Sequence, residues 1–274
     1  MQFRCGRFTL DVGTPKVMGI VNVTPDSFSD GGKYTQAEVA VAHALQLIEE
    51  GAAVLDIGGE STRPNAAPVT VEEELRRVIP VIEALVAHNI AVPISIDTYK
   101  PAVMRAAIAA GASMVNDVRG LQEPEALDII AASDAGVCIM HMQGTPQTMQ
   151  DNPHYEDVVA EVKDFLRIQR DACLQAGIQQ DRIMLDPGFG FGKTRAHNIA
   201  LAKALPQLLD LGCPLLVGLS RKSVLGQMTG NDVDARLYAS IAAAVVSGMQ
   251  GAHLLRVHDV KATVEALKVV AALK

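Results

Sequence analysis

The chain has 274 residues, of which 49% are hydrophobic, and its 31 acidic and 24 basic residues give a net charge of −7. This length and composition suit one large domain, and we expect residues 1–274 to form a single one. The acidic balance excludes a basic stripe for nucleic acid, and no uninterrupted apolar stretch reaches the ~20 residues needed to cross a bilayer.

The first residues show no charged segment followed by an apolar signal core, so we expect a cytoplasmic protein. The four cysteines, Cys5, Cys138, Cys173 and Cys213, are scattered without CxxC spacing. We expect reduced, mostly buried thiols rather than a disulfide framework or a zinc site.

Residues 1–15 alternate weakly around Phe8, Thr9 and Leu10, which predicts a short β-hairpin. Eight short apolar runs then follow, at residues 17–23, 54–57, 94–96, 114–115, 137–140, 183–185, 215–219 and 254–257. Helical patterns rich in alanine and leucine separate these runs, as is typical of parallel strands joined by crossover helices. We therefore predict an α/β protein with a single (β/α)8 TIM barrel whose floor is covered by the N-terminal hairpin.

The connecting segments differ in length. Helical patterns at residues 36–50 and 155–176 each end beside a glycine suited to a helix C-cap, Gly51 and Gly177. Residues 24–34 and 58–69 are longer loops, and we expect them to act as lids. Residues 240–249 are apolar almost all round, so an outer helix there would leave an apolar face for a partner subunit.

In a closed barrel the carboxyl ends of all strands meet on one face. Three polar residues at such ends, Asp97, Asn116 and Asp186, have the oxygen and amide groups that bind a flat aminopyrimidine ring. Each has an alternative: either carboxylate can cap the helix that follows, and Asn116 can be a turn residue. The combination of all three favours a binding site.

Four cationic residues lie at or just past the ends of the last two runs: Arg221, Lys222, Arg256 and His258. Barrels frequently bind phosphate at this position, so these residues predict an anion site. Arg221 and Lys222 can instead form a solvated basic pair, although Lys222 is the better placed to point inward. Ser223 begins a helix there, and its backbone N–H can bind a carboxylate.

Asn22 ends the first run and can place an amide oxygen on Mg²⁺, which needs few protein ligands when phosphate and water complete its coordination. Without a bound phosphate, Asn22 is equally well explained as a structural residue. The glycines at residues 188–192 do not have the G-x-G-x-x-G spacing of dinucleotide-binding loops. We expect them to let Phe191 reach over the pocket.

The motifs of the whole chain, taken in order, resemble those of the dihydropteroate synthase family. They are Asn22-Val23-Thr24-Pro25-Asp26-Ser27-Phe28, Gly58-Gly59-Glu60-Ser61-Thr62-Arg63-Pro64, Asp97-Thr98, Asn116-Asp117, Met140-His141-Met142-Gln143-Gly144, Asp186-Pro187-Gly188-Phe189-Gly190-Phe191-Gly192-Lys193, Ser220-Arg221-Lys222-Ser223 and Arg256-Val257-His258-Asp259.

This resemblance implies condensation of 6-hydroxymethyl-7,8-dihydropterin pyrophosphate with p-aminobenzoate, giving 7,8-dihydropteroate and pyrophosphate, with sulfonamides as competitive inhibitors. It also implies a homodimer. It implies that Asp97, Asn116, Asp186, Lys222 and Arg256 bind the pterin. It assigns the pyrophosphate to Asn22 with Mg²⁺, Arg63, Arg256 and His258. It assigns p-aminobenzoate to Phe28, Thr62, Pro64, Phe191, Lys222 and Ser223.

Among these residues the resemblance gives catalytic roles to Asp97, Lys222, Arg256, His258 and Arg63. None is an obvious general base, so we expect an SN1-like path in which Asp97 stabilises a pterin methylene cation. Two positions depart from the family pattern, Asn65 and Ala239, where glycine is common. The alternatives are a pterin-binding methyltransferase domain and a non-catalytic pterin-binding homologue.

Overall fold

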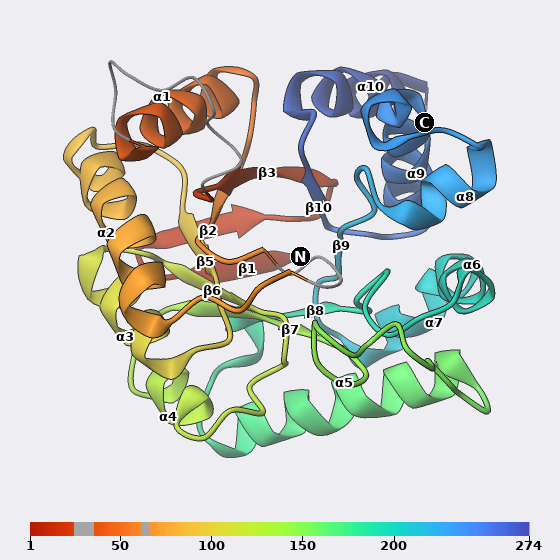
Figure 1. Cartoon of the computed structure of the whole chain (residues 1–274), viewed down its shortest axis with the longest axis horizontal. Helices are drawn as coiled ribbons and strands as arrows, with labels where there is room; N and C mark the ends of the chain where they lie inside the picture. The colour runs from red at the N-terminus through yellow and green to blue at the C-terminus, as the bar shows by residue number, and fades with distance from the viewer. Residues whose placement is uncertain (25–35, 62–65, 274) are drawn as a thin grey trace.

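The computed structural model describes residues 1–24, 36–61 and 66–273. Within them, parallel strands form a ring that helices surround (Figure 1). The ring strands in chain order are β3 (Lys16–Asn22), β4 (Val54–Gly58), β5 (Ile94–Asp97), β6 (Met114–Asp117), β7 (Gly136–Met140), β8 (Ile183–Asp186), β9 (Leu216–Val217) and β10 (Leu254–Val257).

The strands pair in the order β8-β7-β6-β5-β4-β3-β10-β9, and every pairing in this ring is parallel. A parallel bridge between Leu185 and Leu215 connects β8 with the residue that precedes β9. Beside it, the Leu185 amide donates to the Pro214 carbonyl over 2.9 Å. This contact closes the ring, and the predicted (β/α)8 barrel is confirmed.

One predicted strand is longer than the observed one. The apolar run at residues 215–219 forms only the two-residue strand β9, because pairing ends at Val217 and the chain turns at Ser220 and Arg221. In that turn the Lys222 amide donates to the Leu219 carbonyl over 3.2 Å. The turn carries Ser220, Arg221 and Lys222 away from the strand direction.

Helices cover the outside of the ring, and none of those in the described ranges has both the length and the apolar character needed to cross a membrane. Gly51 and Gly111, with φ of 101° and 114°, follow two helix ends in the left-handed conformation that glycine favours. The helices are α1 (Gln36–Glu49), α2 (Val71–Ala87), α3 (Pro101–Ala110), α4 (Ala126–Ala131), α5 (Val158–Gln175), α6 (Arg195–Lys203), α7 (Leu205–Leu208), α8 (Ser223–Thr229), α9 (Leu237–Met249) and α10 (Val260–Leu273).

Helix α5 begins at Val158, three residues later than the apolar pattern predicts. The reason is the N-cap: Asp157 Oδ1 accepts from the amides of Val159 and Ala160 over 3.0 and 3.1 Å. Residues 155 and 156 therefore belong to the loop before the helix. In that loop the Tyr155 hydroxyl donates to the Gly192 carbonyl over 2.8 Å.

The predicted hairpin is present as β1 (Gln2–Cys5) and β2 (Phe8–Asp11), which pair antiparallel. Phe3 and Cys5 are fully buried in one apolar cluster with residues from the amino-terminal ends of the ring strands. The fit is tight, because a Cβ added to Gly136 would lie 2.7 Å from Phe3 Cζ. The hairpin therefore covers the barrel floor, as predicted.

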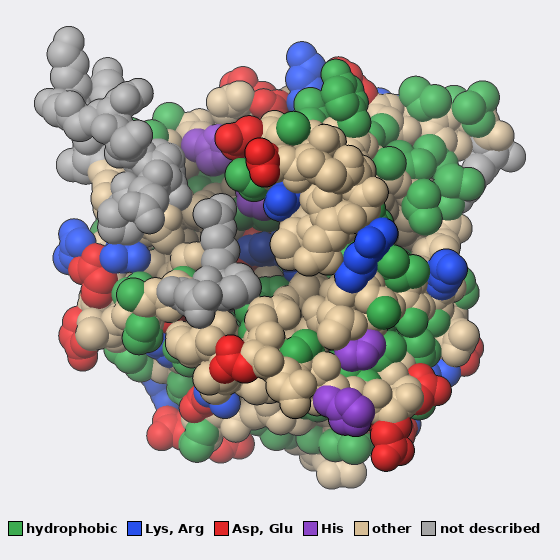
Figure 2. All heavy atoms as spheres, turned by 45° about the vertical axis from the view of Figure 1, so that its right-hand side comes forward, with side chains coloured by type: hydrophobic (Ala, Val, Ile, Leu, Met, Phe, Trp, Pro, Cys, Tyr) green, Lys and Arg blue, Asp and Glu red, His purple; other side chains and the backbone are tan. Residues whose placement is uncertain are grey.

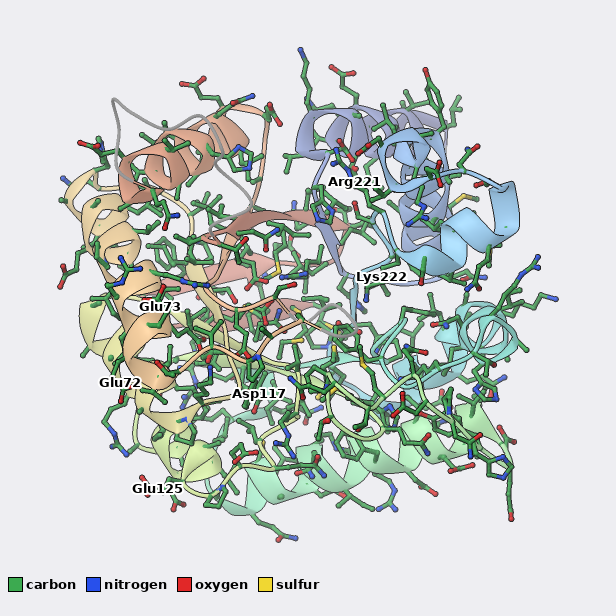
Figure 3. All side chains as sticks on the ribbon, in the orientation of Figure 1. Glu72, Glu73, Asp117, Glu125, Arg221 and Lys222 are labelled. Carbon is green, nitrogen blue, oxygen red and sulfur yellow. The ribbon has the colours of Figure 1, made fainter. Side chains whose placement is uncertain are left out.

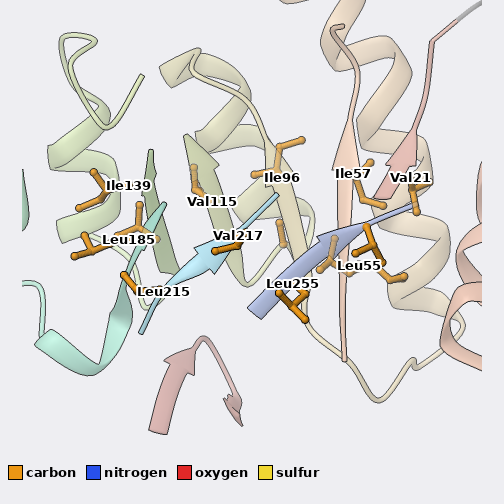
Figure 4. Packing of buried hydrophobic residues seen from close by; sticks show 14 of the residues in the cluster. Val21, Leu55, Ile57, Ile96, Val115, Ile139, Leu185, Leu215, Val217 and Leu255 are labelled. Atoms are coloured by element: carbon orange, nitrogen blue, oxygen red, sulfur yellow. The ribbon is translucent and has the colours of Figure 1, made fainter. Parts of the chain in front are cut away.

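Side chains alternate between the two faces of each ring strand. Leu55, Ile57, Val115 and Leu255 belong to the large cluster between ring and helices, shown in Figure 4. The alternate residues point into the ring. In its lower part these are apolar, as with Val54, but towards the carboxyl ends they become polar. This change places the polar groups together at one end.

Candidate active site

An arginine and two aspartates form a buried network at the carboxyl ends of the strands. Arg256 on β10 donates through Nε to Asp56 Oδ2 on β4 and through Nη2 to Asp97 Oδ2 on β5, both over 2.6 Å. Asn116 on β6 donates to the same Asp56 oxygen over 3.1 Å. Three predicted residues from distant parts of the chain thus meet in one network.

Three buried oxygen atoms of this network accept no hydrogen bond from the described residues: Asp56 Oδ1, Asp97 Oδ1 and Asn116 Oδ1. An unpaired buried acceptor is unfavourable, so these atoms are open to donors from a bound ligand or from water. Burial also raises the pKa of Asp97 above its ordinary value, and Arg256 opposes that shift. The geometry suits a flat ligand with several N–H groups.

Asp186 and Lys222 lie beside this network: a Cβ added to Gly218 would lie 3.7 Å from Arg256 Cβ and 4.0 Å from Lys222 Nζ. Asp186 ends β8, and its Oδ1 accepts from the Gly188 amide over 2.7 Å. Lys222 donates to the Phe189 carbonyl, and its Nζ lies 4.6 Å from the centre of the Phe191 ring. Burial lowers the pKa of Lys222 to about 8, while the negative charge of Asp186 favours its protonated form. Phe191 therefore reaches the pocket beside Lys222.

His258 and Arg221 have different surroundings. Ser220 Oγ lies 3.0 Å from His258 Nδ1, and the His258 amide donates to the same oxygen over 3.2 Å. Arg221 has a left-handed backbone with φ of 57° and binds Asp259 through Nε and Nη2 over 3.0 and 2.6 Å. Figure 3 shows Lys222 nearer the middle of the molecule than Arg221.

The Arg221 guanidinium pairs with Asp259 while 40% of the side chain stays exposed. A contribution of Arg221 to the anion site stays a prediction. The left-handed backbone separates two neighbouring basic side chains, of which Lys222 joins the site.

The Asn22 amide is placed beside the network by strand pairing, because Asn22 pairs with Gly58 and Gly58 pairs with Asp97. A Cβ added to Gly58 would lie 3.9 Å from Asn22 Oδ1 and 3.7 Å from Asp97 Oδ2. No group of three or more His, Cys, Asp or Glu residues suited to a metal occurs in the part of the chain that the structure describes. The donor set thus fits an ion that takes one amide oxygen from the protein and most ligands from substrate and water.

Several predicted residues cannot be placed. Phe28, Thr62, Arg63 and Pro64, with the departure at Asn65, lie outside the described residues. Ser223 is exposed at the first position of α8, and Ala239 lies in α9 away from the network.

Sequence reasoning missed two buried residues at the site. Asp56 is fully buried and binds Arg256, although it lies within an apolar run. The two-residue alternation with Val54 and Gly58 is the signal that assigns it to the inner face. Lys193 is 3% exposed, and no pattern in the sequence distinguishes it from a surface lysine.

The space-filling view shows a hollow in one face of the molecule, with Lys or Arg side chains visible inside it (Figure 2). The family model described as pterin binding enzyme matches residues 18–258. The barrel, its buried acceptors and this match together define a pterin-binding enzyme.

The relatives narrow the assignment. The dihydropteroate synthase of Escherichia coli strain K12 is 53% identical over 264 residues, which are 96% of this chain and 93% of that protein. The enzyme of Neisseria meningitidis serogroup B is 52% identical over 274 residues, covering 97% of this chain and 95% of its own.

Solved structures agree. Dihydropteroate synthase of Xanthomonas albilineans with 4-aminobenzoic acid has a TM-score of 0.94 at 56% identity and covers 99% of this chain and 97% of its own. The Yersinia pestis enzyme in a sulfonamide complex has a TM-score of 0.93 at 49% identity, and the match covers 100% of this chain and 99% of that enzyme. The chain belongs to the dihydropteroate synthase family of transferases.

Proposed function

We propose that this chain condenses 6-hydroxymethyl-7,8-dihydropterin pyrophosphate with p-aminobenzoate, releasing pyrophosphate and forming 7,8-dihydropteroate. The observation that carries the proposal is the set of unpaired buried acceptors on Asp56, Asp97 and Asn116. The pterin ring has amino and ring N–H groups on one edge, which are the donors that these atoms lack. A related structure from Xanthomonas albilineans, 53% identical, was solved with 7,8-dihydropteroate.

In this proposal Asp97, Asn116 and Asp186 bind the pterin edge, and Lys222 binds an acceptor of the ring. Arg256 lies against the ring while Asp56 and Asp97 hold its guanidinium. Ion pairs on two sides fix the plane of that group, so the ring can be bound without first ordering an arginine.

We assign the pyrophosphate to Asn22, Arg63, Arg256 and His258. Mg²⁺, bound to Asn22 and to phosphate oxygens, would supply positive charge to the departing pyrophosphate. Ser220 fixes the His258 ring through Nδ1, which leaves Nε2 as the nitrogen directed away from that contact. His258 can then donate to a phosphate oxygen through Nε2.

We assign p-aminobenzoate to Phe28, Thr62, Pro64 and Phe191, with Lys222 and Ser223 near its carboxylate. The cation over the Phe191 ring supports this part of the assignment, because it places an aromatic face and a positive charge 4.6 Å apart. Those two groups suit the ring and the carboxylate of one small acid.

The reaction follows an SN1-like path in this proposal. The bond between the pterin methylene carbon and the pyrophosphate oxygen breaks, and its electrons leave with pyrophosphate. The Asp97 carboxylate stabilises the resulting cation electrostatically. The amine nitrogen of p-aminobenzoate then attacks the methylene carbon and loses a proton to solvent or pyrophosphate, so no protein general base is required.

The decisive experiment measures pyrophosphate release with each substrate alone and with both together. Release that requires both substrates supports the synthase. Pterin binding without any release would contradict it and would favour the non-catalytic homologue. Methyl transfer from a methylated pterin would instead favour the methyltransferase domain, but the relatives described above favour the synthase.

The proposal also covers the domain organisation of the chain and its location in the cell. We propose that residues 1–274 act as a single pterin-binding domain and that the protein is cytoplasmic. Supporting the latter, all four cysteines are free and buried, as in proteins of reducing compartments.

A further inference from the structure

The loop between β8 and α6 is held by side chains along its whole length. Each of the five consecutive carbonyls of residues 188–192 accepts from a side-chain donor. The pairs are Gly188 with Lys193 (2.9 Å), Phe189 with Lys222, Gly190 with Gln150 (2.6 Å), Phe191 with Lys193 (3.0 Å) and Gly192 with Tyr155 (2.8 Å).

Lys193 is the only one of these residues that supplies two of the bonds. Its Nζ also lies 2.9 Å from His141 Nδ1 and donates to the His141 carbonyl over 3.3 Å. None of these four acceptors is a carboxylate, and the lysine is 3% exposed. Lys193 Nζ is thus surrounded by neutral acceptors, an arrangement that orders the backbone rather than compensating a charge.

Two backbone segments meet at this lysine. A Cβ added to Gly188 would lie 1.9 Å from the His141 carbonyl oxygen, and one added to Gly192 would lie 2.6 Å from that of Gln143. The loop therefore packs backbone to backbone on the segment after β7. Lys193 bonds to both segments and holds them together.

The electrostatics of the pair agree with this geometry. Burial lowers the pKa of His141 to about 3, and the nearby Lys193 charge acts in the same direction. His141 is therefore neutral, so its Nδ1 can accept while Nε2 carries the proton. Burial lowers the pKa of Lys193 well below its ordinary value, the Asp186 charge opposes this shift, and the Lys222 charge adds to it.

The loop presents two groups of the active site. Phe191 reaches Lys222, and Lys222 itself donates to the Phe189 carbonyl. We propose that Lys193 is a positioning residue for the arylamine substrate: it fixes residues 188–192 so that Phe191 and Lys222 are preset before p-aminobenzoate binds. This inference rests on the proposed function.

The first test compares Lys193→Met with Lys203→Met, a control at the exposed last turn of α6. We expect the KM for p-aminobenzoate to rise at least about tenfold in Lys193→Met, and more than the KM for the pterin ester, because Phe191 serves only p-aminobenzoate and small displacements of positioning groups are costly. The KM for the pterin ester should rise clearly less, because Asp97 and Asn116 lie on other strands and keep their hold on the pterin, although Lys222 contacts both substrates. The control should match the wild type.

An unchanged KM for p-aminobenzoate, or an equal rise in both KM values, would overturn the inference. A merely structural lysine would lower the melting temperature and the fraction of active enzyme without this split. Wild-type turnover separates the two proposals: if it is absent, the proposed function fails, whereas normal wild-type turnover without the split contradicts only the positioning role.

A second pair of variants keeps the inference testable if Lys193→Met does not fold. His141→Asn retains an acceptor near the position of Nδ1, and His141→Leu removes it. We expect only the leucine variant to raise the KM for p-aminobenzoate selectively. Equal KM values in both variants would show that this contact does not position the loop.

Discussion

Arg256 Nη2 lies 2.6 Å from Asp97 Oδ2, and this contact joins β10 to β5 across the two strands that separate them in the ring. The same guanidinium binds Asp56 on β4. One side chain therefore connects both carboxylates at the centre of the site. Removing either charge changes the electrostatic balance of the whole network.

Asp97→Asn keeps the shape of this side chain and removes its charge. We expect kcat/KM to fall by about 100-fold or more, since electrostatic stabilisation of a transition state is typically worth that much. The melting temperature should change little, because Asp97 ends a strand at the pocket. Asp210→Asn, at an exposed ion pair with Lys163, is the control. Near-normal turnover in Asp97→Asn would remove this residue from the mechanism.

Lys222→Ala removes the cation that lies beside Asp186 and over Phe191. We expect kcat/KM to fall by about 100-fold or more, because both substrates lose a charged partner. The measurement is the initial rate of pyrophosphate release, with Lys203→Ala as the matched lysine control. A loss no larger than that of the control would contradict the assigned role.

The activity should fall as the pH rises through about 8, because burial lowers the pKa of Lys222 to about 8 and the ammonium is the useful form. Stability should respond in the opposite direction. Between that pKa and the ordinary value of 10.5, the unfolded chain binds the proton and the folded chain does not, so this group's contribution to stability rises with pH.

A pH profile of kcat/KM for the free enzyme, measured with a parallel denaturation series, checks both signs. An alkaline limb absent up to pH about 9.5 would contradict the assignment of Lys222. Loss of activity that follows loss of structure would contradict it as well.

A buried lysine joins the two described ends of the second long loop. Lys100 Nζ lies 2.7 Å from Glu60 Oε2 and 2.5 Å from Glu74 Oε2, and it donates to the Val69 carbonyl over 2.6 Å. The side chain of Lys100 is 11% exposed, that of Glu60 7% and that of Glu74 1%. Lys100→Met leaves two buried carboxylates without this cation, and we expect a loss of about 3 kcal/mol in the free energy of unfolding.

Urea denaturation at neutral pH measures this loss. Lys163→Met breaks an ion pair whose aspartate is 72% exposed, and it should cost less than about 1 kcal/mol. Equal losses in the two variants would show that burial does not strengthen the Lys100 cluster.

Helix α9 exposes Tyr238, Val246 and Met249, with exposed fractions of 82%, 52% and 60%. Exposed apolar side chains on one outer helix favour self-association, and we expect the wild-type protein to sediment as a homodimer. Val246→Glu should sediment as a monomer, because it places a charge in the contact. A monomeric wild type would contradict the prediction.

Much of the fold could be predicted because the apolar runs and intervening helical patterns repeat in a fixed order. The same reasoning identified Asp97, Asn116, Asp186 and Arg256, since each lies at a strand end. It could not decide the direction of a side chain that the local backbone sets. The left-handed turn at Arg221 directs one basic residue to Asp259 and leaves its neighbour Lys222 to face Phe189.

Asp56 and Lys193 show a second limit. The Asp56 carboxylate inside an apolar run is explained by two distant partners, Asn116 and Arg256, which lie 60 and 200 positions away. Lys193 is explained by carbonyl groups, which every residue has and no sequence pattern distinguishes. Side chains whose partners are distant or belong to the backbone therefore require the three-dimensional structure.

The hairpin of β1 and β2 leaves molecules no passage through the floor of the ring, because Phe3 and Cys5 fill it. Substrates and product must then enter and leave at the carboxyl ends of the ring strands. A pterin ester bound against the deep acceptors would have to arrive before the arylamine covers it, and the joined product can depart only by the route along which both reactants entered. We therefore expect the pterin ester to bind before the arylamine.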